Sequence, residues 1–308
     1  MIWLGESRGY LADWVTQRWV RLTGRLVDTT REPWLAGPVG NPRGIGPGFF
    51  RELARRERLE VRPGGEGHAC GLLADFEALA APDFDPRQVH ASVIDFYVRT
   101  SAYDLDAWAE WCGAFRPFGR LLARLFSRRL QQLNVPLSGL DTSRGVTSEV
   151  LQLVDPTSGA IRLTAWVREL IGSGNVLYAG AYALSAVPGR RGLCVKVVFP
   201  LPNGNAMVLM QPEAHPDGSF SVVSAGRGFG DPGFYFTVRD RCGRVWARYL
   251  RSLKESIRVY PAEGGVVRAD HVLTLWGATF LRLHYRLRAT APVAVATTER
   301  NAEAVERE

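Results

Sequence analysis

The stretch "LCVKVVFPLPNGNAMVLMQPEAHPDGSFSVV", residues 193–223, decides the fold, because two short turn signals separate three apolar runs. Within the runs, apolar and β-branched residues recur with the period of two that is typical of strands. The separators, "PNGN" at Pro202 and "HPDG" at His215, consist of residue types that favour tight turns. No amphipathic helix divides the runs, so the stretch predicts an antiparallel meander.

The same pattern extends over residues 146–288, with further turn signals at "DPTSG" (Asp155), "PGRRG" (Pro188) and "DRCG" (Asp240). It predicts about eight or nine strands, longer than the usual five or six residues. A sheet of that size has two vulnerable edges unless it curls or closes. We therefore expect one continuous antiparallel sheet that is strongly curved or closed.

The region before residue 145 shows helical spacing instead. Apolar residues at intervals of three and four predict a helix over residues 10–27, whose stripe suits either core packing or a membrane interface; they are Leu11, Val15, Trp19, Leu22 and Leu26. Residues 31–48 are rich in proline and glycine and predict an irregular arm that proteolysis should remove without loss of the core. A short charged helix, "FFRELARRERLE", follows it.

Residues 68–133 are predicted to be helical as well. One helix begins near Asp85 as N-cap and Pro86 at the first helical position. Its buried stripe is predicted to contain Val89, Val93, Phe96 and Tyr97. A second helix is predicted to carry Leu105, Trp108 and Trp111.

A third helix, "FRPFGRLLARLFSRRLQQL" (residues 115–133), has a row of arginines at intervals of four, namely Arg116, Arg120, Arg124 and Arg128. Its leucines Leu121, Leu122 and Leu125 form a separate face. Such segregation is typical of a helix that covers a sheet and also of a helix on an anionic membrane. We favour packing, with peripheral contact between the arginines and anionic lipid as the alternative.

These elements predict an α+β fold in which a helical N-terminal half packs on a long, curved or closed antiparallel sheet. By element order alone, residues 115–288 resemble the helix-grip and calycin groups of lipid-binding proteins, although no residue motif supports the resemblance and "TAW" at Thr164 is not the G-x-W signature. The predicted parts are an N-terminal helix and arm (1–67), a helical segment (68–144), a β domain (145–288) and a disordered tail (289–308).

Composition excludes several classes of function. The formal charge is +7, but the arginines are spread through all segments, so no specific nucleic-acid site is expected. Four separated cysteines without zinc spacing predict reduced thiols and no metal site. The glycine-rich "SAGRGFGDPG" at residues 224–233 precedes a strand rather than a helix, so it predicts a turn and no cofactor.

Without a signal peptide or an apolar spanning run, the expected location is cytoplasmic.

The expected function is non-enzymatic binding of an apolar or amphipathic small molecule or lipid in a cavity of the sheet. The candidate lining residues are Trp166, Tyr178, Tyr182, Phe199, Met207, Met210, Phe234, Phe236 and Trp246. The alternatives are an enzyme in the same cavity, with Asp270, His271 and Asp231 as weak catalytic candidates, and a protein-interaction scaffold. The last strand alternates leucines with Arg282, His284, Arg286 and Arg288, which predicts a solvated face or an anion site.

Overall fold

The computed structural model describes residues 11–41, 44–65, 67–113, 115, 117, 145–172 and 174–290. Strands account for 49% and helices for 18% of the described residues, and the sheet is open. The predicted α+β fold with a helical N-terminal half is therefore wrong: the protein is mostly antiparallel β, with three α-helices in the part of the chain that is described. The predicted closure of the sheet is not found either, whereas its continuity is.

The helices are α1 (Leu11–Thr23), α2 (Phe49–Glu57) and α3 (Ala91–Val98). The first strands are β1 (Arg25–Val27), β2 (Glu60–Pro63) and β3 (Tyr103–Trp111). The meander consists of β4 (Val146–Val154), β5 (Ile161–Leu170), β6 (Val176–Ala186), β7 (Leu193–Leu201), β8 (Gly204–Ala214), β9 (Phe220–Val223), β10 (Gly233–Arg239), β11 (Val245–Leu250), β12 (Leu253–Pro261), β13 (Val267–Leu275) and β14 (Ala278–Ala289).

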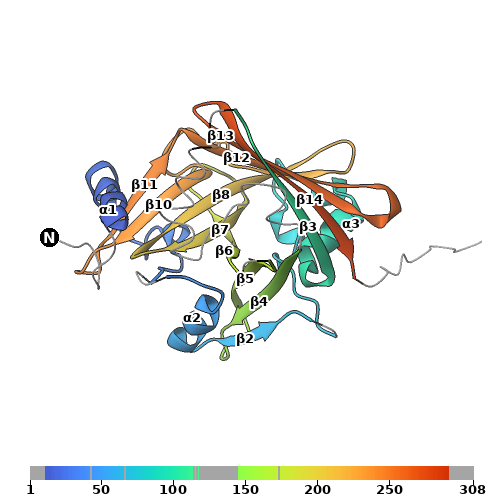
Figure 1. The fold of residues 1–308 in the computed structure, drawn as a ribbon. Coiled ribbons are helices and arrows are strands. Elements are labelled where there is room, and N and C mark those ends of the chain that lie inside the picture. Colours follow the sequence, from blue (N-terminus) through green and yellow to red (C-terminus); the bar gives the residue numbers. More distant parts are fainter. Residues whose placement is uncertain are drawn as a thin grey trace, which may run out of the picture.

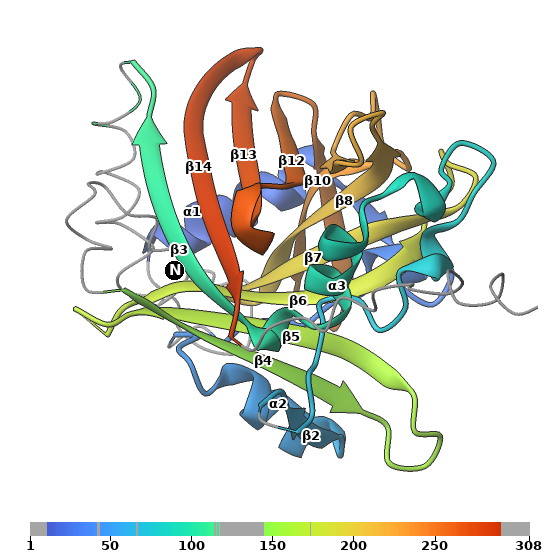
Figure 2. The ribbon, with the colours of Figure 1, turned by 90° about the vertical axis from the view of Figure 1, so that its right-hand side faces the viewer.

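The strands lie in the order β2-β4-β5-β6-β7-β8-β9-β12-β13-β14-β3, and every pairing is antiparallel. Strand β8 is the branch point, because residues 204–209 pair with β10 while residues 211–214 pair with β9. Strands β10, β11 and β1 form a wing beyond this branch. Figures 1 and 2 show that the sheet bends strongly, so that it has a concave and a convex face.

The concave face holds the larger core cluster, into which α3 inserts as a plug at one end of the curved sheet (Figure 2). The predicted stripe of α3 and the turn before it is buried in full: Val89, Val93, Phe96 and Tyr97. Asp85 caps a 3-10 turn by accepting a hydrogen bond from the Arg87 N–H at 3.1 Å, and His90 caps α3 itself. Because residues 70–107 and residues 150–287 contribute to the same cluster, these two regions fold as one packed unit.

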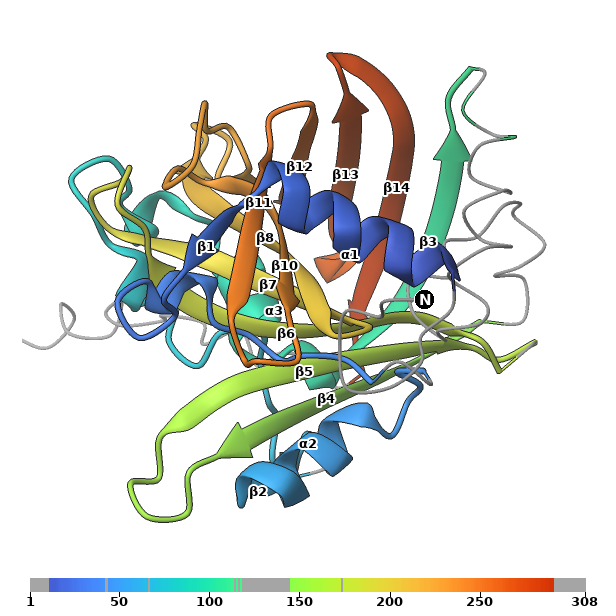
Figure 3. The ribbon, with the colours of Figure 1, turned by 90° about the vertical axis from the view of Figure 1, so that its left-hand side faces the viewer.

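The convex face packs on α2 and on the proline- and glycine-rich arm (Figures 1 and 3). The described residues of the arm, 31–41 and 44–48, are irregular apart from a 3-10 turn at Pro33–Leu35, but Trp34, Leu35 and Ile45 are buried in the second core cluster. Its backbone also bonds to the sheet, where the Gly40 N–H donates to the carbonyl of Leu201 at 3.0 Å. This burial argues against the predicted removal of the arm without damage to the core.

Residues 103–111 form strand β3 at a sheet edge instead of the predicted second helix. The spacing of Leu105, Trp108 and Trp111 is helical, but the buried positions alternate, with Tyr103, Leu105 and Ala107 inside and Trp108 half exposed. Pairing with β14 overrides the local pattern, since tertiary context commonly decides such cases. The arginine helix and its residues Arg116, Arg120, Arg124 and Arg128, together with residues 291–308, lie outside the described residues.

Strands β13 and β14 are joined by a two-residue turn at Trp276 and Gly277. Both residues have positive φ, 50° and 82°, as type I′ hairpin turns require. Tryptophan is unfavourable in this region, and its side chain is 81% exposed.

We expect Trp276→Asn to stabilise the protein by about 1 kcal/mol, because asparagine tolerates the left-handed conformation that strains tryptophan. Thermal unfolding of the two proteins checks this. An unchanged or lower melting temperature would mean that the exposed indole makes a stabilising contact that offsets the strain.

Candidate functional site on the concave face

Two charged side chains, Arg168 on β5 and Glu255 on β12, point inward together with the buried residues of their strands. On β5 the inward row is Thr164, Trp166, Arg168 and Leu170, and all four are buried. On β12 the inward row includes Glu255 and Val259, which are also buried. Buried charges are costly, so their presence on the concave face marks a candidate site.

The Arg168 side chain lies among three aromatic rings. Its guanidinium carbon is 4.4 Å from the ring centre of Trp166, 4.9 Å from that of Tyr178 and 5.3 Å from that of Tyr285. Arg168 is only 4% exposed, and its Nε and Nη1 atoms are buried without a hydrogen-bond partner. Aromatic rings stabilise the cation, but they leave these two N–H groups without an acceptor.

Glu255 and His271 form a close pair beside this cation. The Glu255 Oε1 atom lies 2.6 Å from His271 Nε2, although the ring N–H is not aligned for a hydrogen bond. The other ring nitrogen, Nδ1, is 3.5 Å from the hydroxyl of Tyr285. The Glu255 carboxylate is therefore in close contact with the His271 imidazole. Within the described residues, no ion pair joins Glu255 to Arg168.

Two further tyrosines complete the polar layer. The Tyr178 hydroxyl donates to that of Tyr182 at 2.6 Å, and Gly180 between them leaves room for this, since a Cβ there would lie 2.6 Å from the Tyr178 hydroxyl oxygen. Burial raises the pKa of Tyr178 well above its ordinary value, and the neighbouring Tyr182 adds to the effect. Burial likewise raises the pKa of Tyr285, while the charge of Arg168 partly offsets it. All three phenols stay neutral near pH 7 and can donate hydrogen bonds.

This polar layer, made of Arg168, Glu255, His271, Tyr178, Tyr182 and Tyr285, lies directly next to the plug. Trp166 contacts both sides, because its ring centre is 6.4 Å from Phe96 of α3 and 5.9 Å from Tyr178. Tyr178, Tyr285 and His271 keep partial exposure, so the layer is not completely sealed from solvent. Chemically it offers cationic donors, neutral phenol donors and a carboxylate–imidazole pair.

The structure does not bring the nine predicted lining residues into one cavity. Trp166, Tyr178, Tyr182, Phe199, Met210 and Phe234 belong to or pack against the concave core. Met207 is buried in the convex core, and Phe236 and Trp246 lie beneath α1. An open depression of about 330 Å³ lies elsewhere, between the β11–β12 turn and the tip of the β13–β14 hairpin, and is lined by Arg251, Ser252, Lys254, Trp276 and Gly277.

The three catalytic candidates are separated. His271 points inward to Glu255, while Asp270 points to the outer face, where its Oδ1 lies 2.7 Å from His284 Nδ1. Asp231 lies in the glycine-rich loop, which is a turn followed by β10, and accepts from the N–H groups of Arg227 and Gly228. Only His271 of the three belongs to the polar layer.

The cationic row of β14 meets carboxylates of this chain. Arg286 and Arg288 both contact Asp106 of β3, at 2.9 and 3.2 Å. Arg282 contacts Glu110 at 3.6 Å, and His284 contacts Asp270. The outer face thus carries a ladder of cross-strand ion pairs. Each of these four cationic side chains already has a carboxylate partner within the chain.

Arg168 and Glu255, which carry the site, were missed by sequence reasoning. The available signal was the phase of the strand pattern: a charged residue in step with Trp166 or Val259 must point inward. The four cysteines are free thiols.

In the described residues, no three His, Cys, Asp or Glu side chains gather as metal ligands. No described helix has the length and apolar character needed to cross a membrane. Comparisons of the chain with known protein families, with curated proteins and with solved structures gave no significant match.

Proposed function

We propose that the concave face binds a small amphipathic molecule through its anionic group, with Arg168 as the anion-binding residue. The observation that carries the proposal is the buried guanidinium with two N–H groups that lack an acceptor. A buried donor without a partner costs about 1 to 3 kcal/mol, more when it is charged, and a bound carboxylate or phosphate would recover that cost.

The apolar part of the ligand would lie against the aromatic side chains that border the polar layer. Phe199 packs edge-on against Tyr178, with ring centres 5.2 Å apart, and Phe234 lies on the same face. Pockets for small molecules commonly combine such walls with a few polar groups that fix the orientation. Because Arg168 Nε and Nη1 are buried, the anion would enter by displacing the partly exposed ring of Tyr178 or Tyr285.

The test uses cis-parinaric acid, a fluorescent long-chain carboxylic acid, and its uncharged methyl ester. We expect Arg168→Gln to weaken binding of the acid about 10- to 100-fold, since a hydrogen bond to a charged group contributes about 1.5 to 3 kcal/mol. Fluorescence titration of both ligands with the full chain measures the change.

The methyl ester should bind the wild type and Arg168→Gln with equal affinity. Arg162→Gln is the matched control, because Arg162 lies on the same strand but is exposed. Equal affinity of the acid for the wild type and Arg168→Gln would reject Arg168 as the anion-binding residue. Failure of the wild type to bind the acid would reject this ligand class.

A second candidate is an enzyme that uses the Glu255–His271 pair for proton transfer. The 2.6 Å contact within a largely buried layer favours it, because general acid–base catalysis needs a positioned imidazole with a carboxylate beside it. Mass spectrometry of the acid and the ester after incubation with the protein tests for chemical conversion. Conversion that His271→Asn abolishes, with binding retained, would favour the enzyme over the pure binder.

A further inference from the structure

Helix α1 differs from an ordinary surface helix, because it buries polar side chains and exposes apolar ones. Among residues 13–23, the buried side chains of this helix are Asp13, Gln17 and Val20, and the first two are each 4% exposed. Gln17 holds the helix in place, since its Nε2 donates to the carbonyl of Pro202 at 2.9 Å. Polar contacts, rather than an apolar stripe, therefore attach much of α1 to the sheet.

The apolar stripe predicted from the sequence faces outward instead. On α1, Val15 and Leu22 are 54% and 71% exposed, while Trp19 is 37% exposed and its ring edge also contacts Phe236. Leu26, which lies in strand β1 rather than in the helix, is 55% exposed. Several large apolar side chains exposed on one side of a helix are a candidate interaction site. The sequence allowed two roles for this stripe, core packing or a membrane interface. Core packing is wrong for these four residues, and the membrane interface stays a prediction.

The exposed charged residues of α1 have one sign, whereas the acidic residues next to β1, Asp28 and Glu32, are paired with Arg31 and Arg25. The charged residues of α1 are Asp13, which is buried, and Arg18 and Arg21, which are not. Arg21 covers the ring of Trp246 with its guanidinium 5.5 Å from the ring centre, and Arg248 of β11 lies 6.0 Å from Trp19. The stripe thus has a cationic border, which is complementary to an anionic surface.

The position of α1 connects this surface to the concave face. It packs on Phe236, Trp246 and Arg248 of β10 and β11, which share a face with Phe234 and Val208 of the concave side. Figures 2 and 3 show α1 across the end of the curved sheet opposite to α3. A surface that contacts α1 would lie at the unplugged end.

Charge argues against two other occupants. A second copy that met this face across a twofold axis would bring Arg18 and Arg21 toward their own equivalents. The segment 118–144 is also basic, with five arginines and a single aspartate. The terminal segment 291–308 contains four glutamates, but its apolar residues are only alanine, valine and one proline, which offer little to match the stripe.

We infer that α1 and the adjoining strand β1 dock the protein on the surface of an anionic phospholipid bilayer, with Val15, Trp19 and Leu22 of α1 and Leu26 of β1 in the interface and Arg18 and Arg21 at the headgroups. Interfacial helices combine an apolar face, an aromatic residue and basic flanks in this way. The inference does not depend on the ligand site, because a docked protein need not bind a carboxylate.

The experiment is co-sedimentation of the full chain with phosphatidylcholine vesicles that do or do not contain phosphatidylglycerol. We expect binding to the anionic vesicles, and at least about a tenfold loss in the double variant Leu22→Gln/Leu26→Gln, which removes apolar burial. Arg18→Gln and Arg21→Gln should each weaken binding about fivefold at low salt, with no effect at high salt.

Ile171→Gln is the matched control, because Ile171 is a 57% exposed apolar residue in the turn between β5 and β6, and its substitution should leave binding unchanged. Unchanged melting temperatures show that the leucine variants fold. Arg168→Gln should still sediment with vesicles, which separates this result from the ligand test.

Three results would overturn the docking inference. The first is that the full chain does not bind anionic vesicles, even if a chain without residues 291–308 does bind them. The second is a leucine variant that binds as well as the wild type. The third is a dimer in light scattering that Leu22→Gln/Leu26→Gln converts to monomer, since the face would then join two copies.

Discussion

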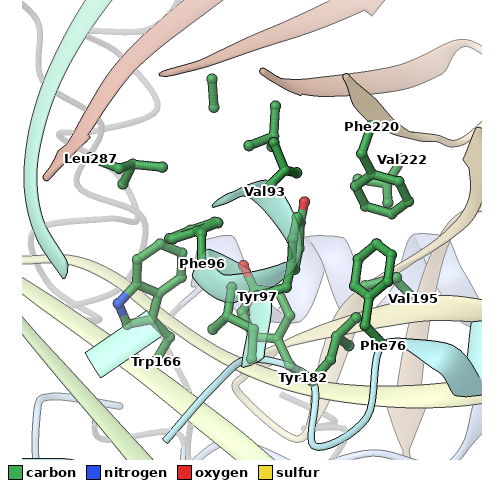
Figure 4. Packing of buried hydrophobic residues seen from close by; sticks show 14 of the residues in the cluster. Phe76, Val93, Phe96, Tyr97, Trp166, Tyr182, Val195, Phe220, Val222 and Leu287 are labelled. Atoms are coloured by element: carbon green, nitrogen blue, oxygen red, sulfur yellow. The ribbon is translucent and has the colours of Figure 1, made fainter. Parts of the chain in front are cut away.

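Replacing Phe220 by alanine is expected to lower the free energy of unfolding by about 3 to 5 kcal/mol, the usual cost of deleting a buried phenylalanine ring. Phe220 is fully buried on β9, and its ring centre lies 5.0 Å from Phe76, 5.6 Å from Phe84 and 5.1 Å from Tyr97. Figure 4 shows Phe220 near Phe76. These partners come from the loop before α3 and from α3 itself. The truncation therefore leaves a cavity where three parts of the chain meet.

Equilibrium unfolding in urea measures this effect. Trp108→Ala is the control, because Trp108 is an aromatic residue on an edge strand but is 45% exposed, and such surface changes usually cost about 0.5 kcal/mol. A loss below about 1 kcal/mol for Phe220→Ala would show that the plug and the sheet are not packed as described.

The strands of the meander could be predicted from the sequence because their signals are local. The predicted run 193–201 coincides with β7, and the run 205–214 differs from β8 by one residue. Turns with proline, glycine or asparagine separated the strands correctly. Two strand breaks were missed, the turn between β11 and β12 at Arg251–Ser252 and the β13–β14 hairpin at Trp276–Gly277, because neither contains a strong pair of turn residues.

The N-terminal half was harder because contacts distant in sequence decide it. Strand β3 has helical spacing, yet its partner is β14, about 170 residues later. In α1 the periodicity predicted a helix correctly, but it could not show which side faces the sheet. No local sequence pattern shows whether the sheet is open or closed, since closure depends on whether its two edge strands pair with each other.

The candidate site was found only in part. His271 was singled out with Asp270 as its neighbour in sequence, whereas its partner in space is Glu255, whose strand pairs with β13. Arg168 is unremarkable in composition and becomes visible only when the phase of β5 is fixed by Trp166. Pairing between strands brings these groups together, and a single sequence does not contain the register.

Lys196 gives a second large effect, which depends on pH. It lies on the convex side of β7, is 7% exposed and donates to the carbonyl of Ala36 in the arm. Burial lowers its pKa from 10.5 to about 8, because the ammonium loses its hydration. The folded protein thus keeps a costly charge at neutral pH.

The sign of the pH dependence follows from that direction. Between about pH 8 and pH 10.5 the unfolded chain binds a proton at Lys196 that the folded protein does not, so this residue makes stability rise with pH across that window. The shift corresponds to about 3 kcal/mol, at 1.36 kcal/mol per pKa unit. Tyrosines that titrate in the same range affect the wild type and a Lys196 variant equally, so only the difference between the two is informative.

We therefore expect Lys196→Met to be more stable than the wild type at pH 7, and this advantage to shrink by about 3 kcal/mol as the pH approaches 10.5. Unfolding in urea at a series of pH values measures the difference. The lost hydrogen bond to Ala36 shifts the whole curve by about 1 kcal/mol without changing its slope, since that bond is absent from the variant at every pH. A difference that does not change with pH would show that the ammonium stays hydrated, and that the arm does not seal the convex core over Lys196.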